Sequence, residues 1–177
     1  MKFLLILLIS FNSVGMAKKS IPSVINERNN NNSFVNVTKF NGFKRSEIDN
    51  FWIYSEKLNK TISSQCFKDF ILSADLRKTN GKTNQQVLND ILTKRVNVEL
   101  TMYYSKRSTV GYTYPNTPKI WFNRKFHSNF SYCKSASNLA HEASHKIGYG
   151  HSKRYHINRP KSVPYSINSG FDKCCLE

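Results

Sequence analysis

The chain has 177 residues and a formal net charge of +16, with 27 Lys and Arg against 11 Asp and Glu. Its length is sufficient for one domain with a substantial hydrophobic core and too short for two domains of ordinary size. The positive charge favours contact with anionic polymers of a cell envelope, phospholipid head groups or acidic proteins, and it also promotes solubility by itself. Because the basic residues are scattered and no recognition module is visible, we expect no specific nucleic-acid partner.

The first 17 residues have the pattern of a secretory signal peptide. Lys2 provides the positive n-region, residues 3–11 the apolar segment, and Gly15-Met16-Ala17 a small-x-small cleavage site. The apolar run is shorter than the about 20 residues that a membrane-spanning helix needs, and no cysteine follows it to carry a lipid anchor. We therefore expect a secreted or periplasmic protein that has no membrane span. We also expect it to be a monomer.

Residues 18–40 are predicted to form a flexible, asparagine-rich linker. Residues 29–32 are all asparagine, and the segment has few apolar side chains. The compact domain is predicted to follow this linker and to occupy residues 41–177.

The first half of this domain is predicted to be helical. Apolar side chains at helical spacing predict a helix over residues 46–62, with Ser46 as its N-cap. Residues 66–74 continue this helix or form a short second one. Asn80-Gly81 predicts a turn, and residues 83–94 form a further helix.

Strands are predicted next, followed by one more helix. Apolar and polar residues alternate over residues 96–104, which is typical of a half-buried strand. Residues 111–118 are rich in turn-forming types, and residues 119–126 are predicted to form a second strand. A last helix is predicted over residues 138–147.

This last helix carries side chains with the spacing of a metal site. Residues four apart lie on one face of a helix, so His141 and His145 can bind the same metal ion. Glu142 projects about 100° around the helix from His141, which places it beside the metal. There it can hold a zinc-bound water and accept its proton.

A third histidine follows the end of the helix. Gly148 is predicted to end the helix, because glycine enters the left-handed conformation without steric cost. The chain can then turn and bring His151 back as a third ligand. Three protein ligands and one open position are typical of a catalytic zinc site, whereas a purely structural site has no use for Glu142.

The pattern HExxHxxGxxH over residues 141–151 resembles the zinc-binding consensus of the metzincin metallopeptidases, with every fixed position present. The resemblance implies one catalytic Zn²⁺ ligated by His141, His145 and His151, with Glu142 as the general base. It implies a hydrolase, a secreted zinc metalloprotease that cleaves protein or peptide substrates by a Glu-activated zinc-bound water.

The same resemblance implies an α+β, zincin-like catalytic domain over residues 41–177. We expect N-terminal helices, a small mixed sheet, the active-site helix and an irregular C-terminal segment. The last strand before the zinc helix is expected to be an edge strand that pairs with an extended substrate. Residues 121–125 are its equivalent here, and an ordinary central strand is the alternative.

The chain departs from the family pattern after the third histidine. Metzincins have a tight turn with a methionine beneath the metal, and residues 159–167 contain no methionine. Residues 162–165 are expected to form the equivalent turn, with Val163 or Pro164 under the histidines. In some members of the clan a tyrosine after this turn steadies the oxyanion, and Tyr165 is the candidate for this role. The other interpretation of Tyr165 is a core tyrosine with a satisfied hydroxyl.

Two further histidines, His127 and His156, are expected at the surface or around the site. A fourth protein ligand would close the position that catalysis needs, so neither is predicted to bind the metal.

The four cysteines, Cys66, Cys133, Cys174 and Cys175, are expected to form disulfides in an exported protein. A bond between the two adjacent tail cysteines would be strained. We therefore favour a pairing in which Cys66 and Cys133 each bond one tail cysteine. A second metal site is the alternative, but no CxxC spacing supports it.

Two alternatives to a peptidase remain from the sequence. The first is a zinc hydrolase that acts on peptide or amide bonds of a cell wall, where the positive charge suits an anionic envelope. The second is a basic envelope-binding protein with a non-catalytic zinc site.

Overall fold

Six helices and four strands make up the residues that the computed structural model describes, which are residues 33–152 and 157–176. In chain order they are β1 (Val35–Asn41), α2 (Arg45–Ser63), α3 (Gln65–Ser73), α4 (Asn84–Thr93), β2 (Val96–Tyr103), β3 (Gly111–Thr113), β4 (Lys119–Asn123), α5 (Arg124–His127), α6 (Tyr132–Lys146) and α7 (Val163–Cys174). The fold is therefore α+β, as expected. The predicted signal peptide, residues 18–32 of the predicted linker and His156 lie outside the described residues. Within the described part, no helix has both the length and the apolar character needed to cross a membrane.

The sheet has the strand order β1-β2-β4-β3. The first three strands of this order are parallel, and β3 is antiparallel to β4 at one edge. The last strand before α6 is thus β4, which has a neighbour on each side. The expectation that residues 121–125 form an edge strand is wrong, because β3, within the segment expected to be turn-rich, takes the edge position.

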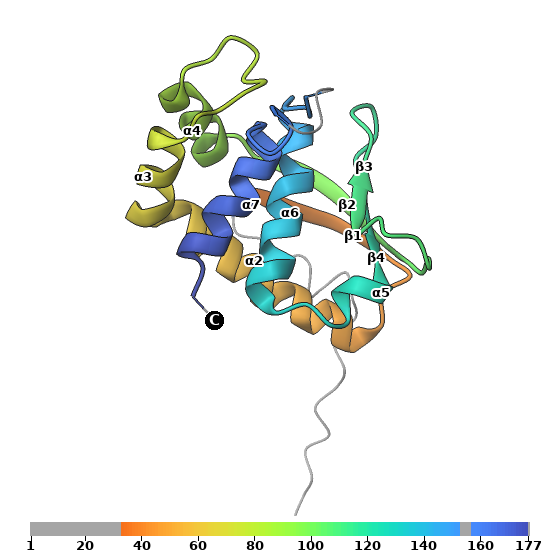
Figure 1. Ribbon diagram of the computed structural model, residues 1–177. Helices are drawn as coiled ribbons and strands as arrows, with labels where there is room; N and C mark the ends of the chain where they lie inside the picture. Colours follow the sequence, from red (N-terminus) through yellow and green to blue (C-terminus); the bar gives the residue numbers. More distant parts are fainter. Residues whose placement is uncertain (1–32, 153–156, 177) are drawn as a thin grey trace, which may run out of the picture.

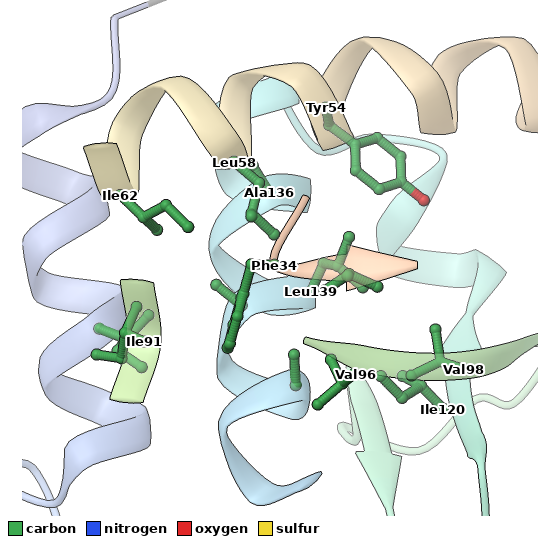
Figure 2. Close-up of a cluster of buried hydrophobic side chains, with 14 of the residues drawn as sticks. Phe34, Tyr54, Leu58, Ile62, Ile91, Val96, Val98, Ile120, Ala136 and Leu139 are labelled. Carbon is green, nitrogen blue, oxygen red and sulfur yellow. The ribbon is translucent and has the colours of Figure 1, made fainter. Parts of the chain in front are cut away.

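The core lies between one face of this sheet and the helices. In β2 the residues Val96, Val98, Leu100 and Met102 are all buried, while the alternate residues are not. Figure 2 shows Leu58 and Ile62 of α2 pointing toward Phe34 and the sheet residues Val96, Val98 and Ile120, with Leu139 of α6 beside them. In Figure 1, α6 and α7 run side by side, with the sheet on one side of them and α3 and α4 on the other.

Several predicted elements are confirmed with small shifts at their ends. These are the helices over residues 46–62 and 83–94 and the strand over residues 96–104. Residues 65–73 form a separate helix, because Ser64 has an extended backbone and its Oγ accepts a hydrogen bond from the Phe67 N–H at 3.2 Å. The predicted turn is also present, since Asn80 and Gly81 both have positive φ.

The domain begins earlier than predicted. Residues 35–41 form β1, which pairs in parallel with β2, so the last part of the linker expected over residues 18–40 belongs to the fold. Val35 and Val37 alternate with polar residues and are buried, which explains the strand.

Helix α6 also begins earlier than residue 138. Ser131 is its N-cap, and the Ser131 Oγ accepts a hydrogen bond from the Lys134 N–H at 3.2 Å. Ala136, Leu139 and Ala143 continue one buried stripe along the helix. The strand predicted over residues 119–126 ends instead at Asn123, whose side chain caps the short helix α5.

The C-terminal segment is a helix, which corrects the expectation of an irregular segment. Val163, Ile167 and Phe171 recur at a spacing of four and are buried against α6 and α3. Proline in the first turn of α7 is compatible with a helix, because the N–H that it lacks has no partner there.

Two disulfides hold the end of α7. Cys66 pairs with Cys174, and Cys133 pairs with Cys175, so the predicted pairing of each internal cysteine with one tail cysteine is confirmed. The bonds connect α7 to α3 and to α6. They also indicate an oxidising or extracellular environment.

Candidate metal centre

Three histidines converge where α6 ends. His141 and His145 lie on the same side of α6, as their spacing predicts. Gly148 has a φ of +101°, and its N–H donates to the His145 carbonyl at 3.1 Å, which closes the last turn. The chain then brings the His151 ring to within 5.0 Å of the His141 ring and 4.6 Å of the His145 ring, measured between ring centroids.

The distances between the three rings suit a single metal ion. The ligand atoms of His141, His145 and His151 all lie within 4.8 Å of one another. The Nε2 atoms of His141 and His151 are 3.3 Å apart, and donors at zinc–nitrogen distances in a tetrahedral site lie about 3.3 Å from each other. Among the described residues, no other group of three His, Cys, Asp or Glu side chains is placed to share a metal.

Hydrogen bonds on the far side of two rings fix their tautomers. His145 Nδ1 lies 2.6 Å from the Tyr149 carbonyl, which can only accept, so Nδ1 carries the proton. Ser162 Oγ donates to the Arg159 carbonyl at 2.7 Å, and it therefore accepts from His151 Nδ1 at 3.3 Å. In both rings the free lone pair is on Nε2, the atom available to a metal.

Burial keeps the rings neutral. His141 is 7% exposed, and burial lowers its pKa to about 3, with a further contribution from His145 and His151. Its Nδ1 makes no hydrogen bond of normal geometry to the described residues, although the Pro164 carbonyl and the Asn168 side chain lie close to the ring and oppose the lowering. Burial also lowers the pKa of His151, to about 4, and that of His145. Neutral imidazole is the form that binds a metal.

Glu142 follows His141 on α6 and lines the same cleft. It is 4% exposed, and burial raises the pKa of its carboxyl group to about 7, against the lowering effect of Lys146. The Lys146 ammonium group donates to the carbonyls of Tyr114 and Thr117, so its charge is held at the connection between β3 and β4. A carboxyl group of this pKa can both accept and return a proton near neutral pH.

Tyr165 lies against the histidine rings. Its ring centroid is 5.0 Å from that of His141 and 4.8 Å from that of His151. Tyr165 belongs to the first turn of α7, together with the buried Val163 and Pro164. The tight turn expected over residues 162–165 is therefore the start of a helix, because Ser162 provides the N-cap and the apolar residues face α6.

The histidines open into a cleft of about 830 Å³. One wall consists of β3 and the loop before it, residues 108–113, and the floor is α6. The opposite wall is formed by residues 148–151 and the first turns of α7. The cleft therefore runs along the free edge of the sheet.

His127 does not belong to the histidine cluster. Its ring packs on Phe122 with centroids 4.4 Å apart, and its Nε2 lies 3.0 Å from Asn138 Oδ1. Burial lowers the pKa of His127 to about 4. The expectation that His127 is no ligand is consistent with this position.

Three polar residues around the site were missed by sequence reasoning: Asn138, Ser162 and Asn168. Asn138 precedes His141 by three positions on the same helix, so helical spacing was a usable signal for it. Ser162 and Asn168 carried no such signal, because their positions depend on α7, which was expected to be irregular.

The chain matches no protein-family model, no curated protein and no solved structure. The side chains themselves fit a metal ion. Three neutral imidazoles, of which His145 and His151 have Nε2 free, lie close together on the cleft, and these are the features of a three-ligand site with one position left for a substrate or water.

Proposed function

We propose that the protein is a zinc-dependent endopeptidase, of metzincin-like architecture, that acts outside the cytoplasm. The observation that carries the proposal is the convergence of His141, His145 and His151 beside Glu142 in an open cleft. Zinc suits this donor set, because three imidazoles are typical of its catalytic sites and the Nε2 atoms of His141 and His151 have the spacing of a tetrahedral site. When bound, zinc supplies a Lewis acid that polarises a carbonyl group and acidifies water.

Glu142 carries out the proton transfers in this proposal. It accepts a proton from the water whose oxygen attacks the scissile carbonyl carbon. It then returns that proton to the amine nitrogen as the C–N bond breaks. Tyr165, whose ring lies against two of the histidines, donates a hydrogen bond to the carbonyl oxygen as negative charge develops on it.

The edge strand β3 supplies the place for an extended peptide. It pairs with β4 on one side only, so its other side offers backbone N–H and C=O groups toward the cleft. Lys146 holds the β3–β4 connection onto α6 through the carbonyls of Tyr114 and Thr117. This strand takes the role that the sequence had suggested for residues 121–125.

The two disulfides support an extracellular place of action, because such bonds persist in oxidising compartments. The signal peptide at residues 1–17 remains a prediction that agrees with them.

Replacement of Glu142 by glutamine tests the proposal. The amide has the shape of the carboxylate but accepts no proton, so Glu142→Gln should keep stoichiometric zinc and lose peptidase activity by about 10³-fold. Zinc content is measured by mass spectrometry and activity on an unfolded protein substrate, with zinc re-addition after chelation as the control. Wild-type activity in Glu142→Gln, or activity in zinc-free protein, contradicts the mechanism.

A further inference from the structure

The part of the cleft between α6 and α7 is lined by groups that donate hydrogen bonds. We call it the amide subsite and define it by Lys134, Asn138 and Asn168, all of which line the cleft. From the helical rise, Asn138 lies about 4.5 Å before His141 along α6, and Lys134 lies about 10 Å before His141. Asn168 lies one turn after Tyr165 on α7. The subsite therefore adjoins the proposed reaction centre.

Asn138 is oriented by a buried partner. Its Oδ1 accepts a hydrogen bond from His127 Nε2 at 3.0 Å. The same oxygen faces β3, since a Cβ atom on Gly111 would lie 2.9 Å from it. With the oxygen held by His127, the NH₂ group is the part of the Asn138 side chain that is left to donate to a ligand in the cleft, which Asn138 lines.

Asn168 is oriented in the same way from the opposite wall. Ser137, which is buried, donates a hydrogen bond from Oγ to Asn168 Oδ1 at 2.9 Å. Within the described residues neither amide nitrogen donates to another protein group, so both NH₂ groups remain for a ligand.

The charges around the subsite are positive. Lys134 and Arg159 line the cleft, and among the described residues that line it Glu142 is the only acid. Lys134 pairs with Asp172 at 3.7 Å, but both side chains are at least half exposed. An exposed pair of this kind is worth little, so the ammonium group can turn toward a ligand.

We propose that the amide subsite binds a carboxylate group of the substrate next to the scissile bond. The inference rests on the proposed function and names its substrate class, which is peptides with an acidic residue, or a chain-terminal carboxylate, at that position. Two amide NH₂ groups and one ammonium group match the acceptor oxygens of a carboxylate. A basic side chain would instead meet the like charges of Lys134 and Arg159.

The test uses zinc-loaded protein and a library of fluorogenic peptides that carry Glu, Gln or Lys at each position next to the cleaved bond. We expect kcat/KM for the Glu peptide to exceed that for its Gln counterpart by about tenfold at one such position. Lys134→Glu and Asn138→Asp should each abolish this preference. A Gln peptide with a free carboxylate after the cleaved bond, compared with its C-terminal amide, distinguishes a terminal carboxylate from an acidic side chain.

Lys173→Glu is the matched control, because Lys173 is an exposed lysine of α7 that does not line the cleft. This substitution makes the same change in net charge as Lys134→Glu and should keep the preference for the Glu peptide over the Gln peptide. The proposal is overturned if no carboxylate improves cleavage, or if Lys173→Glu reduces the preference as much as Lys134→Glu does.

A failure of the proposed function can be told apart from a failure of the subsite. If zinc-loaded protein cleaves none of the peptides, the proposed function is wrong, and binding of the labelled Glu and Gln peptides is measured by fluorescence anisotropy. Tighter binding of the Glu peptide that is lost in Lys134→Glu supports the subsite. Equal binding of the two peptides overturns it.

Discussion

The Ser162 hydroxyl group holds His151 in the orientation that suits a metal, and Ser162→Ala removes it. The hydroxyl accepts from His151 Nδ1 at 3.3 Å and donates to the Arg159 carbonyl at 2.7 Å. It makes no capping hydrogen bond to α7, so the helix loses nothing directly. The Arg159 carbonyl keeps the Ser162 N–H as a donor.

The expected effect is weaker zinc binding. Loss of a group that orients a metal-binding histidine lowers affinity by 10- to 100-fold in general, and we expect about tenfold here because the 3.3 Å bond is long. Tenfold corresponds to about 1.4 kcal/mol. Zinc affinity is measured at pH 7 by competition with a chromogenic chelator, and the apo protein's free energy of unfolding is measured in parallel.

Ser166→Ala is the matched control. Ser166 is a buried serine like Ser162 and lies one turn further on, in α7, and it makes no hydrogen bond to the three histidines. It should leave zinc affinity unchanged. If the two variants bind zinc equally well, the Ser162 hydroxyl group has no role in orienting His151.

Other substitutions test the ligands and the stability of the fold. His151→Ala should lose stoichiometric zinc in mass spectrometry while staying folded by circular dichroism, and full zinc retention would exclude His151 as a ligand. Burial raises the pKa of Asp90, but hydrogen bonds led by that from Lys82 outweigh it and lower the pKa to about 2. Ionised Asp90 therefore stabilises the fold above about pH 4. This contribution to the free energy of unfolding, about 1 kcal/mol after allowance for solvent screening, is lost as the pH falls toward 2. Asp90→Asn should remove this part of the pH dependence in urea unfolding at pH 6 and pH 2.5, and an unchanged dependence would contradict the ion-pair account. Removing the Cys66–Cys174 bond by double substitution to alanine should cost about 4 kcal/mol, because the bond closes a loop with a sequence separation of 108. A loss below about 1 kcal/mol in urea unfolding would mean that the chain is already constrained by other contacts.

The histidine cluster was predictable from the sequence because it depends mainly on local geometry. The positions of His141 and His145 follow from helical spacing, and that of His151 from a glycine that ends the helix. The helices of the first half and β2 also follow local periodicity. The bonding of each internal cysteine to one tail cysteine could be predicted because adjacent cysteines rarely bond each other, but which tail cysteine each one bonds could not.

Elements that depend on distant contacts were not predictable in this way. The position of β4 inside the sheet depends on β3, whose three residues have no periodicity of their own. The strand β1 depends on pairing with β2, about 60 residues later in the chain. Local signals for α7 existed in Val163, Ile167 and Phe171, but Pro164 suggested a turn, although proline is compatible with the first turn of a helix.

The disulfides at the end of α7 determine which wall of the cleft can move when a substrate binds. Adjacent cysteines fasten α7 to two different helices, so it can neither slide along α6 nor rotate about its own axis without straining a covalent bond. The opposite wall has no such restraint, since β3 is held by a three-residue ladder and by the contacts of Lys146. The two walls therefore differ in stiffness, and a bulky peptide should displace the β3 wall while the side that carries Tyr165 and Asn168 stays fixed.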